Sequence, residues 1–134
     1  MVKKEAQKDW DEFTSSRVVE KSNIDNAKLV VRLQKPKGKV DVVIDTDTYN
    51  EIDDQFAVAY LVKSDEKLNL KAIYAAPFHN EKSTGPADGM EKSYQEIMNI
   101  LALLEREDLK PYVYRGSTAY MPSETEPVIS DAAK

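Results

Sequence analysis

Four aspartates fall within residues 45–54, where an apolar run gives way to a helical pattern: Asp45, Asp47, Asp53 and Asp54. No Lys or Arg lies among them, so their charges would repel one another unless a cation were bound. Carboxylate oxygens are the ligands that Ca²⁺ and Mg²⁺ take in proteins. Helix capping is the ordinary alternative for Asp53 or Asp54 taken singly. It does not account for Asp45 and Asp47 at a strand end, so the cluster predicts a metal or catalytic site.

The flanking residues predict the elements that position these carboxylates. Val42, Val43 and Ile44 form a continuous β-branched run, which predicts a strand buried on both faces. A helical pattern over residues 56–62 and an apolar strand pattern over residues 68–74 follow it. Strand, helix and strand in succession make the βαβ unit of a parallel sheet. Open sheets of this kind bind ligands at the carboxyl ends of their strands, which is where the aspartates fall.

Asn80 follows the second strand and belongs to a polar loop predicted over residues 79–89. Parallel strands end at the same sheet edge, so Asn80 could reach the aspartates, although an ordinary turn residue explains it equally well. His79 fits an exposed loop residue better than a functional one. The sequence further predicts a helix over residues 24–33, a helix over residues 88–104, a strand over residues 112–114 and the start of a helix over residues 128–134.

The whole sequence therefore predicts an α/β fold, with a Rossmann-like open parallel sheet over residues 39–134. A charged, helical N-terminal extension is predicted over residues 1–38. A chain of 134 residues allows one ordinary domain.

Composition narrows the classes of function. The net charge of −5 argues against nucleic acid and anionic membranes as partners. The absence of cysteine excludes disulfide scaffolds, zinc ribbons and thiol nucleophiles, and a single histidine excludes a multi-histidine metal site. No signal-peptide core or membrane-spanning run is present in the sequence. We therefore expect a soluble, cytoplasmic protein with a small-molecule substrate, and the sequence leaves homo-oligomerisation open.

The motif Asp45-Thr46-Asp47, followed by Asp53-Asp54 and Ala57, resembles the N-terminal aspartate motif of the inosine–uridine-preferring nucleoside hydrolases. The strand leading to Asn80 is similar to the second motif of that family, and residues 94–117 are similar to its next helix and strand. The likeness is collinear over residues 39–134. The double-aspartate motif is its most specific part, and the later stretches are supportive.

The resemblance implies an enzyme that hydrolyses the N-glycosidic bond of ribonucleosides with a bound Ca²⁺. Asp47 would ligate the metal and act as the base, and Asp54 would be a second metal ligand. Asp53 would hydrogen-bond the ribose hydroxyls, Asn80 would contact the sugar, and Asp45 would support the site. The chemistry is consistent with these residue types, because carboxylates near the sugar stabilise a cationic glycosyl transition state.

Two departures from the family pattern affect this expectation. The family usually links its aspartate pairs through a short glycine-containing segment, whereas residues 48–52 are longer and lack glycine. The segment must bulge, and Tyr49, Asn50 or Glu51 could then project towards a substrate. The family domain is also more than twice as long as the matching region, and its later metal ligands have no counterpart here. We therefore expect the N-terminal portion of a larger domain, without useful turnover by itself.

Two other interpretations remain open at this point. One is a haloacid-dehalogenase-like phosphatase, with Asp45 as nucleophile, Asp47 as acid/base and Mg²⁺ as metal; it leaves Asp53 and Asp54 unexplained. The other is a non-catalytic metal-binding or interaction fragment with an open sheet edge, exposing Tyr112 and Tyr114.

Overall fold

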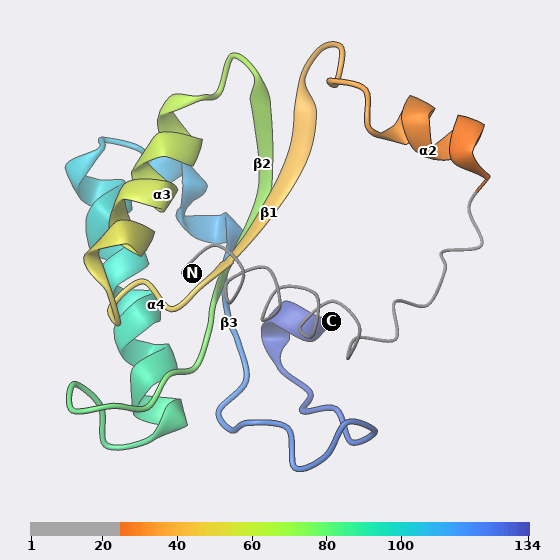
Figure 1. Ribbon diagram of the computed structural model, residues 1–134. Coiled ribbons are helices and arrows are strands. Elements are labelled where there is room, and N and C mark those ends of the chain that lie inside the picture. Colours follow the sequence, from red (N-terminus) through yellow and green to blue (C-terminus); the bar gives the residue numbers. More distant parts are fainter. Residues whose placement is uncertain (1–24) are drawn as a thin grey trace, which may run out of the picture. The chain divides into compact units, whose positions relative to one another are not determined.

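The computed structural model describes residues 25–134 (Figure 1). The chain divides into two units, Met1–Lys35 and Pro36–Lys134, which are described separately. Within the described part of the first unit, helix α2 spans Asn26–Arg32, which confirms a helix in the predicted region. The remainder of the predicted helical extension, up to residue 24, lies outside the described residues.

The second unit is built on a three-stranded parallel sheet with the strand order β1-β2-β3. The predicted βαβ arrangement is confirmed, and it is repeated once. In chain order the elements are β1 (Val40–Thr46), α3 (Ile52–Lys63), β2 (Leu68–Ala75), α4 (Pro86–Leu103), the 3₁₀ helix η1 (Glu107–Tyr112), β3 (Val113–Arg115) and the 3₁₀ helix η2 (Asp131–Ala133).

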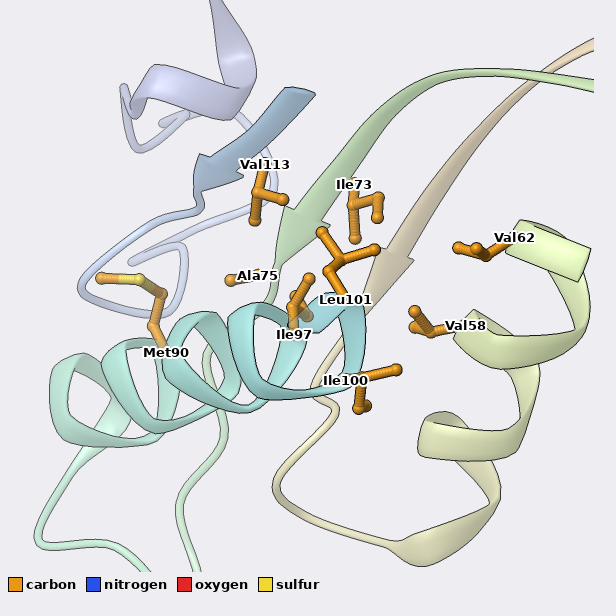
Figure 2. Close-up of a cluster of buried hydrophobic side chains, with 9 residues drawn as sticks. All are labelled: Val58, Val62, Ile73, Ala75, Met90, Ile97, Ile100, Leu101 and Val113. Atoms are coloured by element: carbon orange, nitrogen blue, oxygen red, sulfur yellow. The ribbon is translucent and has the colours of Figure 1, made fainter. Parts of the chain in front are cut away.

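Helices α3 and α4 cover the same face of the sheet (Figure 1). Both crossovers advance the sheet in the same direction, and right-handed crossovers then place their helices on one side. Figure 2 shows side chains from both helices directed at the strands, forming a core of Val58, Val62, Ile73, Ala75, Met90, Ile97, Ile100, Leu101 and Val113. This packed layer holds the strands, and therefore the ends of the strands, in fixed positions.

Burial of β1 on both faces was predicted, and this prediction is wrong. Burial alternates along the strand, and Val43 is 50% exposed on the face opposite the helices. A continuous apolar run is typical of a strand covered on both sides. Here both crossover helices lie on one face, and on the opposite face η2 reaches only the carboxyl end of the strands, beside Asp45 and Tyr74.

The predicted boundaries shift at the C-terminal elements. The third strand begins at Val113 rather than at residue 112, because Pro111 lies inside η1 instead of opening the strand. Helix α4 begins at Pro86, before the predicted position, and proline is well suited to the first helical turn because its missing N–H would be unpaired there in any case. The helix predicted from residue 128 is the short η2.

Gly89 allows α4 to approach the segment that follows β2. A Cβ atom at this position would overlap the carbonyl oxygen of Phe78. We expect Gly89→Ala to destabilise the fold by about 1–3 kcal/mol, although alanine is normally the better helix former. The control is Gly85→Ala, where the added Cβ would meet nothing within 4 Å. Urea unfolding of both variants tests this, and equal midpoints would contradict the close approach.

Candidate functional site at the carboxyl edge of the sheet

The three strands end together at one edge of the sheet. Beyond the paired strands, the amide of Ala76 donates to the Thr46 carbonyl oxygen at 2.8 Å, and the amide of Gly116 donates to the Ala75 carbonyl oxygen at 3.0 Å. A Cβ atom on Gly116 would overlap the same Ala75 carbonyl oxygen. The chain segments leaving the strands are therefore fixed close to one another, and the residues singled out from the sequence follow these ends.

Asp54 is held by a hydrogen-bonded chain of hydroxyl groups. The Thr46 hydroxyl donates to Asp54 Oδ1 at 2.5 Å, and the Oγ1 atoms of Thr46 and Thr48 are 3.0 Å apart. A hydroxyl carries one hydrogen, so Thr48 must be the donor in the second bond. Both threonine side chains are buried. This chain anchors the first turn of α3 to the end of β1, and it directs one Asp54 oxygen towards the strand.

Thr46→Val tests this anchor. Valine keeps the shape of threonine but removes the donor to Asp54, and it leaves the fully buried Thr48 hydroxyl without its acceptor. We expect a loss of about 1–3 kcal/mol in the free energy of unfolding. Thr46→Ser, which keeps the hydroxyl, should be closer to the wild type. Chemical denaturation measures both variants, and a valine variant as stable as the wild type would show that the hydroxyl chain contributes nothing.

Asp47 belongs to a second hydrogen-bonded chain, which reaches the loop after β2. The Asn50 side-chain amide donates to Asp47 Oδ2 at 2.8 Å, and Asn80 Nδ2 donates to Asn50 Oδ1 at 2.5 Å. The Lys82 amide donates to Asn80 Oδ1 at 2.9 Å, and the Lys82 ammonium donates to the Asn50 carbonyl oxygen. Asn80, to which the family resemblance assigned a contact with the sugar, thus lies in the same network as Asp47.

The segment between the aspartate pairs turns directly after β1, where the Asn50 amide donates to the Asp47 carbonyl oxygen at 2.7 Å. Asn50 is the residue of this segment that joins the network, and the Tyr49 amide donates to the buried Ser93 hydroxyl of α4 at 3.5 Å. Glu51 is exposed. The sequence named three candidates in this segment without choosing between them, because the path of a loop without glycine depends on contacts far along the chain.

Asp45 and Asp53 lie apart from these two chains. Asp45 lines a cavity of about 230 Å³ together with Tyr74, Ser117 and Ser130. Partial burial, and then the negative charge of Asp47, raise the pKa of the Asp45 carboxyl. Asp53 is exposed in the first turn of α3, where its charge complements the helix dipole. The exposed position of His79 agrees with its interpretation as a loop residue.

The third strand end is held by a feature that the sequence analysis did not identify. The Arg115 guanidinium donates to both carboxylate oxygens of Glu91, at 2.7 and 2.9 Å, and stacks 3.7 Å from the centre of the Tyr94 ring. These hydrogen bonds lower the pKa of Glu91 to about 2. The contact joins the last residue of β3 to α4, and no local pattern connects two residues so far apart in sequence.

The oxygen donors at this edge meet the needs of a hard cation only in part. Asp47 and Asp54 supply carboxylate oxygens, the type that Ca²⁺ prefers, and each already has one oxygen oriented by a hydrogen bond. Ca²⁺ takes six to eight oxygen ligands, so this pair fits in kind and supplies only part of a shell. Over residues 25–134, no group of three or more His, Cys, Asp or Glu side chains is arranged to hold a metal.

Comparisons of the sequence and structure with protein-family models, with curated proteins and with solved structures give no significant match. No helix among residues 25–134 combines the length and apolar character that a membrane span requires.

Proposed function

We propose that this chain carries part of the active site of a Ca²⁺-dependent hydrolase of N-ribosides, in which water cleaves the bond between ribose and a heterocyclic base. The observation that supports this proposal most is the chain from Asn80 through Asn50 to Asp47, which joins two strand ends at the ligand-binding edge of a parallel sheet. The resemblance of the double-aspartate motif to nucleoside hydrolases supplies the reaction class.

In this proposal Asp47 and Asp54 hold the cation. A bound Ca²⁺ would supply the acidification of water that makes a nucleophile near neutral pH. Asp47 would act as the general base and take a proton from the attacking water, whose oxygen would bond to the anomeric carbon. The base would depart with the electrons of the C–N bond and take a proton from solvent. Asp53 binds the ribose hydroxyls from the exposed first turn of α3, and Asn80 contacts the sugar.

Electrostatics favour this chemistry at this edge. A glycosyl transition state carries positive charge on the sugar, and nearby carboxylates stabilise it. Asp45 acts beside the site, where its own carboxyl is influenced by the charge of Asp47. The cationic groups nearby are already engaged in the structure, since Lys82 bonds the Asn50 carbonyl oxygen and Lys92 bonds Asp88 at 2.8 Å.

Ribose release from a panel of ribonucleosides tests the proposal, with the protein expressed from its complete reading frame. We expect cleavage in the presence of Ca²⁺ and loss of at least about 100-fold on treatment with a chelator, restored by adding Ca²⁺. A phosphate ester is assayed in parallel with Mg²⁺. Cleavage of the ester with no release of ribose would replace the proposal with the phosphatase interpretation.

A further inference from the structure

The hydrogen bonds that end on Asp47 run in one direction only. A carboxylate can only accept, so the end of the Asn50 side chain that faces Asp47 must be its NH₂ group. The Asn50 oxygen then faces Asn80 and accepts from Nδ2 of that residue. This fixes the orientation of Asn80 in turn, and its oxygen accepts from the backbone amide of Lys82, which can only donate.

The direction of the hydrogen bonds is therefore fixed at both ends of this chain, because the Asp47 carboxylate can only accept and the Lys82 backbone amide can only donate. Neither asparagine can rotate its amide by 180° without setting two donors or two acceptors against each other. Hydrogen bonds aligned in this way polarise one another and hold side chains in single conformations. The backbone around Asn50 is fixed as well, since its own amide donates to the Asp47 carbonyl oxygen at 2.7 Å and its carbonyl oxygen accepts from Lys82.

We propose that Asn50 is the positioning residue of this site, which holds the Asp47 carboxylate in one rotamer and sets its position relative to Asn80. Asn50 lies in the inserted segment between the two aspartate pairs, so the insertion has a definite role: it carries the bridge between the carboxylate after β1 and the amide after β2. The proposed function adds a catalytic consequence, but the positioning role is a property of the chain alone.

Substitution by aspartate separates positioning from a merely structural role. Asn50→Asp has almost the same shape and keeps the acceptor for Asn80, but it removes the donor to Asp47 and opposes it with a like charge. Asn50→Ala removes both hydrogen bonds. Asn69→Ala is the matched control, because the Asn69 amide also donates to an aspartate, Asp41 Oδ1 at 2.6 Å, in an exposed pair on β1 and β2.

Nuclear magnetic resonance on residues 1–134 provides the primary readout, which does not depend on activity. Three-bond couplings about the Cα–Cβ bond of Asp47 should report one rotamer in the wild type and in Asn69→Ala. They should report averaging over several rotamers in both Asn50 variants. The Asn80 side-chain amide signals should move towards the values of a free amide in Asn50→Ala and remain shifted in Asn50→Asp. Unchanged Asp47 couplings in both Asn50 variants would overturn the proposal.

Ca²⁺ titration calorimetry and ribose release on the protein from the complete reading frame give the second readout. Partners that orient metal ligands typically contribute 10–100-fold to affinity or activity, so both Asn50 variants should lose that much while their melting temperatures stay near that of the wild type. A wild type that neither binds Ca²⁺ nor releases ribose would refute the proposed function. The Asp47 couplings would still decide whether Asn50 positions that carboxylate.

Discussion

Under the proposed function, Asp47→Asn should reduce ribose release by about 10²–10⁴-fold, the range that a general base contributes. The substitution keeps the shape of the side chain, and the amide oxygen of the new residue can still accept the hydrogen bond from Asn50. It removes the negative charge and the ability to take a proton. The measurement is kcat for a ribonucleoside at saturating Ca²⁺, with the melting temperature recorded beside it.

Asp45→Asn is the matched control for this prediction. Asp45 also follows the apolar run of β1, but its residue lines the cavity beside Tyr74 and its carboxylate belongs to neither hydrogen-bonded chain. We expect a smaller loss of about 10–100-fold, typical of a group that acts through its neighbours. If Asp45→Asn abolished ribose release and Asp47→Asn left much of it, the roles assigned to the two carboxylates would be reversed.

The sequence predicted the framework of the site better than its internal contacts. β1, α3 and β2 were predictable because each has a continuous pattern of its own period, and parallel strands must end at one edge. This rule put Asn80 within reach of the aspartates without distinguishing it from an ordinary turn residue, and the structure connects it to Asp47 through Asn50. The position of Asn50 between Asp47 and Asn80 was not predictable. The conformation of residues 48–52 depends on Ser93 and Lys82, which are distant in sequence.

The burial of individual side chains was predicted less well than the helices and strands. The run Val42–Ile44 has the composition of a strand covered on both sides, yet Val43 is half exposed because both crossover helices lie on the opposite face. Composition reports how apolar a strand is, and it does not report on which side its neighbours lie. In the same way, Phe56 and Tyr60 of α3 are apolar residues at helical spacing yet are exposed, whereas Val58 and Val62 are the residues that pack on the sheet.

Leu101→Ala should lower the free energy of unfolding by about 2–5 kcal/mol, the usual range for a fully buried leucine truncated to alanine. Leu101 is 0% exposed and lies in the core between α4 and the strands, beside Ile73 (Figure 2). The loss has two parts. The removed methyl groups no longer contribute the free energy of transfer from water to the interior, and a cavity remains because a close-packed interior collapses only in part. Domains of this size are stable by about 5–15 kcal/mol in total, so the loss is a large fraction of the free energy of unfolding.

Leu103→Ala provides the control on the same helix. Leu103 is 83% exposed near the end of α4, so its truncation to alanine should change stability by no more than about 0.5 kcal/mol. Both variants truncate a leucine of α4 to alanine, one on the buried face of the helix and one on the exposed face. Urea unfolding compares them directly. Because α4 also carries Ser93 and Glu91, which hold residues 48–52 and the end of β3, Leu101→Ala should also loosen the carboxyl edge of the sheet. Equal stability losses in the two leucine variants would mean that α4 does not pack on the sheet through Leu101, and the positions of Asp47 and Asn80 would then need another source of rigidity.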